Sequence, residues 1–403
     1  MRTACAIAGG GPAGAVLALM LARGGVEVTL LEKHGDFLRD FRGDTIHPST
    51  LQLLDELGLA EEFHRLPHRK AYGVGLETDQ GPVPLADLRR LPGRYQYIAF
   101  VPQWEFLNLI VSEARRYPTF RLLMNAEAHD VLREGDRVRG LRFRTREGER
   151  EIGAELVVGA DGRHSAVRRA AMLRPREFGA PMDVVWFRIS RRPGDRETPF
   201  LRFVPGHPMV GINRDTYWQL AYLIPKGGYA ALEAEGIESL RDTVARVIPF
   251  LAGRVGELGG FGDVSVLDVR LDRLRRWHRP GLLCIGDAAH AMSPVFGVGI
   301  NLAIQDAVAT ANILGPALLR GGPIPESLLA RVQRRRSFSA AVVQAAQRVA
   351  QDRLIRRALD ASSRPIRVPR GLARVPVLSG LLGRLVGTGV VPEHARFGVT
   401  PVS

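Results

Sequence analysis

The stretch TACAIAGGGPAGAVLALMLARGGVEVTLLEK, residues 3–33 of 403, decides the fold. It begins as an apolar strand, turns through GGGPAG, continues as a helix ended by glycine, and closes as a second strand on Glu32. In such a unit Gly9 allows the tight turn, Gly11 lets the backbone approach a pyrophosphate, and Gly14 lets helix and strand pack closely. The stretch therefore predicts a dinucleotide site at the helix N-terminus, where unpaired N–H groups face phosphate.

Glu32 bears on which dinucleotide binds. A carboxylate at the end of the second strand can accept hydrogen bonds from both hydroxyls of an adenosine ribose, and it would repel a 2′-phosphate. FAD or NAD therefore suits this site better than NADP. Pro12 and Ala13 at the turn, and Lys33 after the strand, complete the predicted binding segment.

A second strand end lies in VVGADGRHSAVRR, residues 157–169, where Asp161 faces a turn that Gly162 permits. The residues alone leave two interpretations equally open. One is a nucleotide-binding loop, and the other is an ordinary Asx turn at the end of a strand.

A third motif, CIGDAAHAMSPVFGVGINLAIQDA, spans residues 284–307 and predicts a strand, a glycine loop and a long helix beginning near Gly299. Asp287 at the strand end can bond a ribityl hydroxyl, and Asn301 can bond the edge of a flavin ring. The positive end of the helix dipole would stabilise the negative charge that a reduced flavin carries around N1 and the C2 carbonyl oxygen. This segment therefore favours FAD.

Between the second and third motifs, alternating strands and helices give way to a run of short strands. That order predicts an α/β fold with a doubly wound, Rossmann-like FAD domain of the glutathione reductase type, an inserted, mostly antiparallel substrate-binding sheet domain, and C-terminal helices. The predicted boundaries are 1–73, 98–176 and 270–355 for the FAD domain, 74–97 and 177–269 for the substrate domain, and 356–403 for a helical tail.

The tail contains RVPRGLARVPVLSGLLGRLVGTG, residues 367–389. Apolar side chains share one helical face there, with Arg374 and Arg384 nearby: Val375, Leu378, Leu381, Leu382 and Leu385. A basic amphipathic stretch can lie on a membrane, so a peripheral membrane contact stays open. Packing of this face on the chain's own core is preferred, because prolines and glycines leave little continuous helix.

The composition, 45% hydrophobic and 24% charged residues, is typical of a globular enzyme. No apolar run reaches the roughly 20 residues that span a bilayer, and residues 1–14 lack the layout of a secretion signal, so a cytoplasmic location is expected. Cys5 and Cys284 lie in apolar runs and are predicted to be buried free thiols, and no Cys/His cluster predicts a metal site. The net charge is +14, but the arginines are dispersed and no nucleic-acid-reading module is present, so nucleic-acid binding is not expected.

Taken together, GGGPAG with Glu32, GADGRHSAVR and GDAAHAMSPVFGVGIN resemble the para-hydroxybenzoate hydroxylase-like family of group A, single-component, FAD-dependent monooxygenases. The resemblance covers roughly residues 1–350. It implies that Arg42 contacts FAD, that Gln103 lies near the pyrophosphate, and that the segment of Asp161 serves both FAD and NADPH. It also implies FAD contacts along the third motif, at Gly286, Asp287, Pro294, Gly297, Val298, Gly299, Ile300 and Asn301.

The implied reaction begins when NADPH or NADH binds transiently and reduces FAD. Oxygen then gives a flavin C4a-hydroperoxide, which hydroxylates an aromatic, polyketide-like or quinolone-like small molecule. Arg163, Arg168 and Arg169 are candidates for the nucleotide phosphate, and an ordinary surface role is equally open for them.

Candidate catalytic residues are His47, Pro294 and Gly297. His47 follows a loop expected near the flavin, where it could relay a proton, orient the substrate or only stabilise the loop. His290 is better explained by structural hydrogen bonding. Four aromatic residues on the inserted strands could line an apolar pocket, although a core position is preferred for any single one: Trp186, Phe203, Trp218 and Tyr222.

The sequence bears on three rival functions. A flavin-dependent halogenase would carry WxWxIP, and a geranylgeranyl-type prenyl-chain reductase would carry YxWxFPK. The corresponding stretch is LAYLIPK, residues 220–226, which departs from both at Leu220 and Tyr222. A non-catalytic flavin sensor also stays open. The sequence leaves undecided the substrate, the choice of NADH or NADPH, the oligomeric state and the role of the tail.

Overall fold

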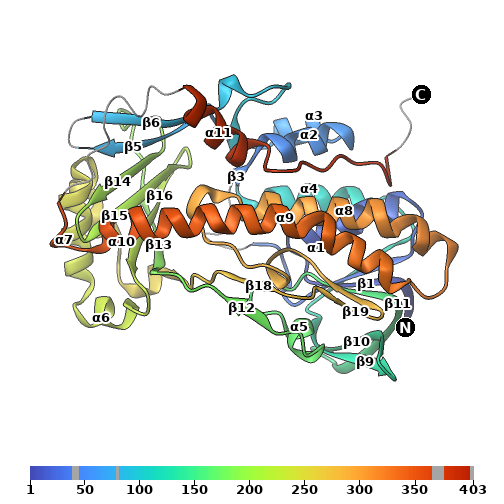
Figure 1. The fold of residues 1–403 in the computed structure, drawn as a ribbon. Coiled ribbons are helices and arrows are strands. Elements are labelled where there is room, and N and C mark those ends of the chain that lie inside the picture. Colours follow the sequence, from blue (N-terminus) through green and yellow to red (C-terminus); the bar gives the residue numbers. More distant parts are fainter. Residues whose placement is uncertain (39–44, 79–80, 365–375, 400–403) are drawn as a thin grey trace.

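The computed structural model describes residues 1–38, 45–78, 81–364 and 376–399. Figure 1 shows an α/β unit beside a second, mostly antiparallel sheet, with the long helix α9 (Glu326–Ala350) running from the first toward the second. This arrangement confirms the predicted fold class.

The first sheet has eight strands and a parallel core. The parallel strands lie in the order β20 (Leu282–Cys284), β11 (Gly148–Gly159), β1 (Arg2–Ala8), β2 (Val28–Glu32) and β8 (Phe120–Met124). Three strands pair antiparallel: β19 (His278–Arg279) with β20, and β10 (Arg137–Thr145) with both β11 and β9 (Glu127–Glu134). Because the central strands are buried on both faces, their sequences are continuous apolar runs.

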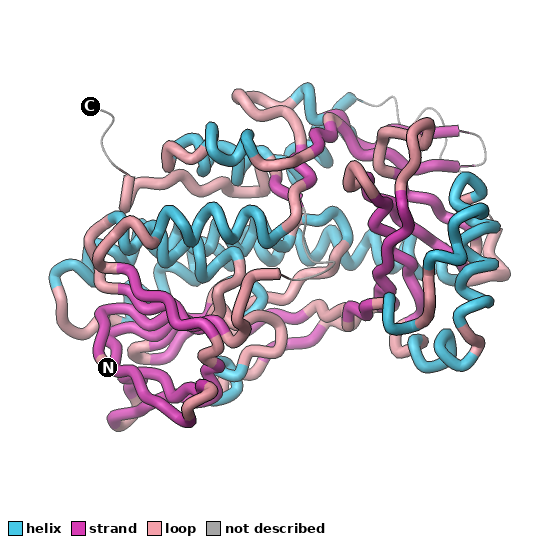
Figure 2. The backbone as a smooth tube through the Cα atoms, turned by 180° about the vertical axis from the view of Figure 1, so that it is seen from behind, coloured by secondary structure: helices cyan, strands magenta, loops and turns pink. Residues whose placement is uncertain are grey.

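Helices cover this sheet, as Figure 2 shows from behind. The packed helices are α1 (Pro12–Arg23), α4 (Gln103–Ala114), α8 (Gly299–Arg320) and α9, while α5 (Ala166–Ala170) packs against β9. Every residue of α1 from Ala13 to Ala22 is buried, which explains why this helix is apolar all round. Beside α8 lie α2 (Pro48–Glu56), α3 (Ala60–Arg65) and a small sheet of β3 (Thr45–Ile46), β7 (Ile98–Phe100) and β4 (Arg69–Ala71).

One helical stretch, Val295–Arg320, is long and apolar enough to cross a membrane by length and composition alone. Within its most apolar window 72% is buried inside the protein, where α8 packs against α1 and α9. This pattern is that of a core helix. Both cysteines are buried and free, and the part of the chain that the structure describes holds no cluster of His, Cys, Asp and Glu that could hold a metal.

The second sheet has seven strands in the order β17 (Ser265–Leu267), β13 (Met182–Ser190), β16 (Tyr217–Pro225), β15 (His207–Asn213), β14 (Phe200–Val204), β5 (Gly73–Thr78) and β6 (Gly81–Asp87). One face is covered by α6 (Tyr229–Ala234), α7 (Ile237–Val247) and the 3-10 helix η2 (Pro249–Glu257), at the far left of Figure 1. The opposite face is turned toward the α/β unit that contains the first sheet. These strands lie within a residue of the ranges predicted for the substrate domain, whose boundaries stay a prediction.

A ribbon of β12 (Pro175–Glu177) and β18 (Asp272–Leu274) joins the two units, and α9 continues through η6 (Gln351–Ile355) into α10 (Arg356–Leu359) beside the second sheet. The C-terminal segment then returns. Helix α11 (Pro376–Gly387) packs against β6 and η1 (Leu88–Arg90), and Phe397 packs between Gly24 and Gly315. Arg374 and Val375 lie outside the described residues.

Candidate active site

The carboxyl ends of β1, β11 and β20 meet at one edge of the parallel sheet and bring the three motifs together. The amide of Ala160 donates to the carbonyl of Ala8 at 2.8 Å, and the amide of Ile285 donates to the carbonyl of Gly159 at 2.9 Å. A Cβ on Gly9 would lie 2.4 Å from the carbonyl oxygen of Ala160, so this approach requires glycine. Open α/β sheets bind ligands at such an edge.

Two helices begin at the same edge. A Cβ on Gly286 would lie 3.3 Å from the Cβ of Ala13 in α1 and 3.1 Å from the Cβ of Ala303 in α8. The N-terminal ends of both helices, at Pro12 and Gly299, therefore flank Gly286. Each end carries a partial positive charge, which suits a pyrophosphate at one and an anionic ring at the other.

The GGGPAG turn has the space and the donors that FAD requires. A Cβ on Gly11 would meet no atom of the described residues within 4 Å, whereas a Cβ on Gly14 would lie 2.0 Å from the carbonyl oxygen of Gly9. The buried Glu32 carboxylate accepts from the amide of Gly10 at 2.9 Å and from the amide of His34 at 3.0 Å, which fixes it beside the turn. These groups fit an adenosine diphosphate moiety.

His47 caps α2 and is 1% exposed. Its Nδ1 lies 2.6 Å from the carbonyl oxygen of Val386 in α11. Because a carbonyl oxygen can only accept, Nδ1 carries the proton and Nε2 of the neutral ring is an acceptor. Nε2 is buried, has no hydrogen-bond partner among the described residues, and lies 3.8 Å from the position of a Cβ on Gly297. The C-terminal helix thus sets the tautomer of a histidine at the glycine loop.

Burial lowers the pKa of His47 to about 4, although the bond to Val386 opposes the shift. The unfolded chain, with an ordinary pKa of about 6.5, takes up the proton first as the pH falls. We therefore expect the free energy of unfolding to fall by about 3 kcal/mol between pH 6.5 and pH 4 on account of this residue.

Urea denaturation at several pH values measures this effect. His47→Asn keeps an amide donor near Val386 and cannot titrate, so its stability should fall less over the same interval. Parallel pH curves for the two proteins would contradict the assignment of a neutral, buried ring.

Asn301 holds the His47 loop onto α8. Its Oδ1 accepts from the amide of His47 at 3.0 Å and from the hydroxyl of Thr50 at 2.7 Å, and its Nδ2 donates to the carbonyl of Thr45 at 3.4 Å. These bonds satisfy the buried amide and tie it to the His47 segment. A contact of Asn301 with the flavin edge stays a prediction.

A row of glutamines on α9 and η6 holds the chain that leads into the glycine loop, and the sequence analysis missed it. Gln344 donates to the carbonyl of Ala291 at 3.1 Å, Gln347 to that of Ser293 at 2.8 Å, and Gln351 to the hydroxyl of Ser293 at 2.8 Å. Their spacing of three and four residues on one helix face was the available signal.

The loop that these glutamines hold, Pro294 to Gly297, is strained. Phe296 has φ 72°, an unusual conformation for a bulky residue. Gly297 also has a positive φ, of 65°, and its carbonyl accepts from the hydroxyl of Thr45 at 3.0 Å. Strained backbone of this kind concentrates at functional loops.

Asp161 lies before α5 and accepts from the hydroxyl of Ser165, the N-cap residue of that helix, and from the amide of Val167. Burial raises the pKa of its carboxyl group above the ordinary value. These contacts run to residues four and six positions further on, and the nucleotide-binding and turn interpretations of this segment both stay predictions.

The three arginines predicted for a nucleotide phosphate are engaged within the protein. Arg163 pairs with Asp287 at 3.2 Å, the buried Arg168 pairs with Asp272 at 3.3 Å, and Arg169 donates to the carbonyl of His164 at 2.6 Å.

The remaining predicted cofactor residues that the structure describes lie at or next to the ends of helices and strands. Gln103 begins α4, which packs against α1, and Lys33 is exposed after β2. Val298 is buried and Ile300 partly buried at the start of α8. Arg42 lies outside the described residues.

The four predicted aromatic residues lie on opposite faces of the second sheet. Trp218 and Tyr222 pack on the helix-covered face, where Trp218 is fully buried, so they belong to the core of this unit. Trp186 and Phe203 lie on the other face and share an apolar cluster with Val295, which precedes the strained Phe296. Of the two pairs, only Trp186 and Phe203 lie on the face toward the glycine loop, because successive residues along a strand point to opposite faces of the sheet.

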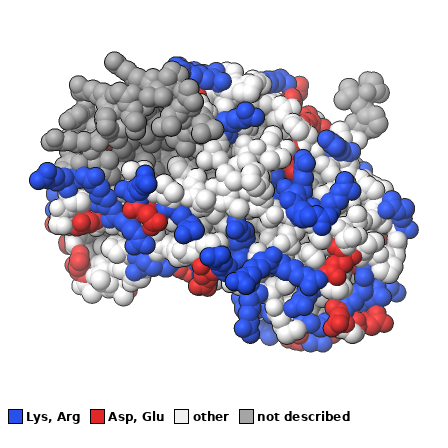
Figure 3. Space-filling model, viewed as in Figure 1, with Lys and Arg blue, Asp and Glu red and all other residues white. Residues whose placement is uncertain are grey.

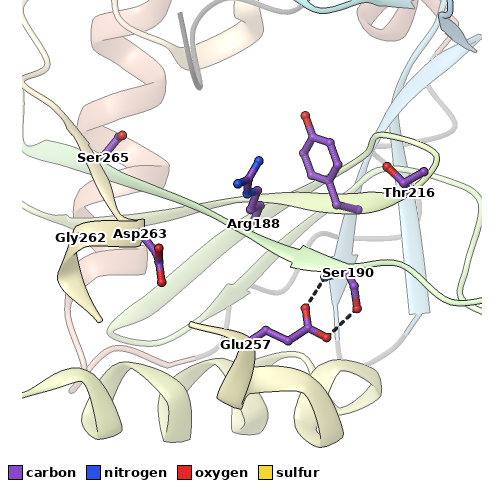
Figure 4. Close-up of a pocket in the computed structure, with 8 residues that line it drawn as sticks. Arg188, Ser190, Thr216, Glu257, Gly262, Asp263 and Ser265 are labelled. Atoms are coloured by element: carbon purple, nitrogen blue, oxygen red, sulfur yellow. Dashed lines mark hydrogen bonds between the residues drawn. The ribbon is translucent and has the colours of Figure 1, made fainter. Parts of the chain in front are cut away.

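A cavity of about 480 Å³ lies at the end of β13 and the beginnings of β16 and β17, next to η2. Ser265 pairs directly with Trp186 in the sheet, Arg188 follows two residues along β13, and both line the cavity. In Figure 4, Arg188 rises from one side of the sheet, whereas Glu257 lies on the other side and accepts two hydrogen bonds from Ser190. The full lining comprises Arg188, Ser190, Thr216, Tyr217, Glu257, Gly262, Asp263 and Ser265.

Known proteins share this sequence and fold. The family described as FAD binding domain matches residues 2–346. The 6-methylpretetramide 4-monooxygenase of Streptomyces rimosus is 36% identical over 324 residues, covering 79% of this chain and 77% of that protein. The structure of PqsL, a probable FAD-dependent monooxygenase from Pseudomonas aeruginosa, superposes with a TM-score of 0.74 at 24% identity, covering 88% of this chain and 97% of that one.

A halogenating enzyme shares the fold as well. The flavin-dependent brominase Bmp2 superposes with a TM-score of 0.76 at 17% identity, covering 96% of this chain and 94% of that one. At this identity the likeness concerns the fold alone, whereas the family match and the Streptomyces relative also carry the sequence. The chain therefore belongs to the FAD binding domain family, and within it to the para-hydroxybenzoate hydroxylase-like, FAD-dependent monooxygenases.

Proposed function

We propose that this enzyme uses NAD(P)H and O2 to hydroxylate an aromatic, polyketide-like or quinolone-like small molecule. The observation that carries the proposal is the apolar cluster against which Trp186, Phe203 and Val295 all pack. This cluster supports an apolar substrate site beside the loop that leads into α8. The Streptomyces relative acts, by its name, on 6-methylpretetramide, which supports a substrate of that class.

FAD, when bound, supplies the redox chemistry and the activation of O2. We propose that the N-termini of α1 and α8 hold its anionic groups, that Glu32 binds the adenosine ribose, and that the glycine loop from Pro294 to Gly299 forms the wall beside the ring. The apolar cluster excludes water from the reacting atoms. The predicted cytoplasmic location stays a prediction.

His47 is the proposed hydrogen-bond acceptor for the substrate. Its Nε2, which has no partner among the described residues, is directed by the bond from Nδ1 to Val386, and the neutral ring can accept a hydrogen bond from a phenolic hydroxyl and orient it. We expect His47→Gln to retain FAD and to lower the rate of product formation about 100-fold, because a misplaced substrate loses about that much rate. FAD absorbance and product yield per NAD(P)H measure the two effects, and an unchanged yield would remove His47 from the mechanism.

Trp186 is the proposed donor to the substrate. Its Nε1 is buried and has no hydrogen-bond partner among the described residues, so a bound molecule with a carbonyl or phenolate oxygen would satisfy it. Arg188 lines the adjoining cavity and suits a polar or anionic end of the same molecule.

Trp186→Phe keeps the apolar surface and removes the donor, so we expect KM for the substrate to rise about tenfold at unchanged FAD content. Trp218→Phe is the matched control, because Trp218 donates to Asp195 on the opposite face. Equal effects on KM from the two substitutions would contradict the proposed orientation of the sheet.

The substrate class is tested by screening aromatic polyketides, quinolones and simple phenols for stimulated NAD(P)H oxidation, followed by mass analysis of the products. We expect a planar, polycyclic compound with a carbonyl or phenolate group to stimulate oxidation and gain one oxygen atom. A halogenated product in the presence of halide would favour the halogenase alternative, and reduction of a prenyl chain without oxygen would favour the reductase.

A further inference from the structure

Three arginine side chains surround the ring of Phe178, where the ribbon of β12 and β18 passes α9. The guanidinium carbons of Arg176, Arg273 and Arg348 lie 5.4, 5.5 and 5.4 Å from the ring centroid. They come from β12, β18 and α9, so three separate elements converge on one aromatic ring. Contact with the ring face stabilises each cation and brings three positive charges close together. We call these residues the Phe178 arginines.

The Phe178 arginines have no carboxylate partner within 4 Å among the described residues. Asp272, between Leu271 and Arg273, pairs with Arg168 at 3.3 Å. Glu177 is exposed and has no ion-pair partner within 4 Å among the described residues. Neither of these nearby carboxylates therefore pairs with the Phe178 arginines.

Two of these arginines repel each other directly. Arg176 and Arg273 are cross-strand partners in the β12–β18 ribbon, an arrangement that destabilises like charges. Burial, and after it the charge of Arg176, lowers the pKa of Arg273 below the ordinary value. An anion among the three side chains would relieve this repulsion.

The Phe178 arginines lie next to residues that hold the segment leading into the glycine loop. Arg348 follows Gln347, which donates to the carbonyls of Ser293 and Val295 at 2.8 and 2.9 Å. Arg273 follows Asp272, whose carboxylate accepts from the amide of Ala291 at 3.5 Å. Figure 3 shows basic side chains gathered on the face where β12, β18 and α5 lie.

We propose that the Phe178 arginines bind the 2′-phosphate of NADPH. This inference rests on the proposed function, because the reaction needs a nicotinamide reductant. Glu32 suits the unphosphorylated ribose of FAD, and the chain carries no second GxGxxG for another dinucleotide. A phosphate monoester carries nearly two negative charges and three acceptor oxygens, which match three guanidinium groups. NADPH is then preferred to NADH.

Calorimetry on the FAD-loaded enzyme tests the site without any turnover, with 2′,5′-ADP and 5′-AMP as probes. We expect wild type to bind 2′,5′-ADP at least tenfold more tightly than 5′-AMP at low ionic strength. The double variant Arg176→Gln/Arg348→Gln should weaken 2′,5′-ADP roughly 100-fold, about tenfold for each arginine removed, and leave 5′-AMP unchanged.

Arg334→Gln/Arg353→Gln is the matched control, since it also removes two arginines. Both are exposed and lie on α9 and η6, one on each side of Arg348 in the sequence. It should lower the affinity for 2′,5′-ADP less than threefold. Equal losses in the two double variants would reduce the effect to net charge and overturn the proposal, as would wild-type enzyme that binds both probes alike.

Steady-state kinetics separate this proposal from the proposed function. Arg176→Gln/Arg348→Gln should raise KM for NADPH with little effect on KM for NADH, at unchanged kcat and FAD content. Selective binding of 2′,5′-ADP without any hydroxylated product would leave the Phe178 arginines in place and reject the hydroxylase assignment. Hydroxylation with no selectivity for 2′,5′-ADP would keep the hydroxylase assignment and reject the Phe178 arginines as the phosphate site.

Discussion

Replacement of Arg336 with methionine is expected to lower the free energy of unfolding by about 3–5 kcal/mol, because it removes the fully buried cation that two buried carboxylates share. Arg336 is fully buried, and its guanidinium lies 3.0 Å from Asp306 and 3.3 Å from Glu393. It also donates to the carbonyl of Val391 at 3.0 Å. The side chain thus ties α8, α9 and the C-terminal segment together.

Asp306 transmits this loss to the cofactor site. Its other oxygen accepts from the amide of Gly286 at 3.0 Å and lies 2.6 Å from Nε2 of His290. Although burial opposes the shift, contacts with His290 and Arg336 lower the pKa of Asp306 below the ordinary value. Bound FAD should therefore be released at a lower urea concentration in the variant.

Arg335→Met is the matched control for this prediction. Arg335 pairs with the same Glu393 at 2.8 Å, but 48% of its side chain is exposed. Exposed pairs contribute about 0–1 kcal/mol. Urea denaturation at pH 7 should separate the neighbouring variants by several kcal/mol, and a similar midpoint for both would refute the role of Arg336.

Gly11→Val is expected to keep the fold and to weaken FAD binding about 100-fold. Gly11 has φ −70° and ψ −178°, which valine adopts without strain, and its Cβ would meet no described atom within 4 Å. The space is that of the pyrophosphate, and overpacking of this kind costs about 1–3 kcal/mol. Fluorescence titration of the apoprotein with FAD measures the affinity.

Substitutions at two further glycines serve as comparisons for Gly11→Val. Gly14→Ala should destabilise the protein itself, because its Cβ would lie 2.0 Å from a backbone oxygen. Gly253→Val, in an exposed position with nothing within 4 Å of its Cβ, should leave FAD affinity unchanged. Gly11→Val with the affinity of wild type would show that the turn does not hold the pyrophosphate.

The ends of β1, β11 and β20 could be predicted from the sequence, because each of these strands is an apolar run followed by a glycine turn. The long helix expected near Gly299 also begins at that residue. These features depend on neighbouring residues, whose hydrophobic period and turn chemistry are legible in one window.

Contacts between segments that are distant in the sequence could not be predicted from local patterns. The bond from His47 to Val386, and that from Arg336 to Glu393, join helices to a C-terminal segment that the sequence analysis described only as an amphipathic tail. The sequence predicted that Trp186 and Trp218 lie on strands of the inserted sheet. It could not say that their side chains point to opposite faces, since pairing register and helix cover decide this.

The central claim is that one atom of O2 enters an organic substrate. It is tested most directly by turnover of the purified, FAD-loaded enzyme with NADPH, a compound that stimulates oxidation, and ¹⁸O2. We expect the product to gain one ¹⁸O atom, and no ¹⁸O to enter when labelled water replaces labelled oxygen. Product without ¹⁸O from O2, or NADPH oxidation that yields only hydrogen peroxide with every aromatic compound tried, would contradict the monooxygenase assignment.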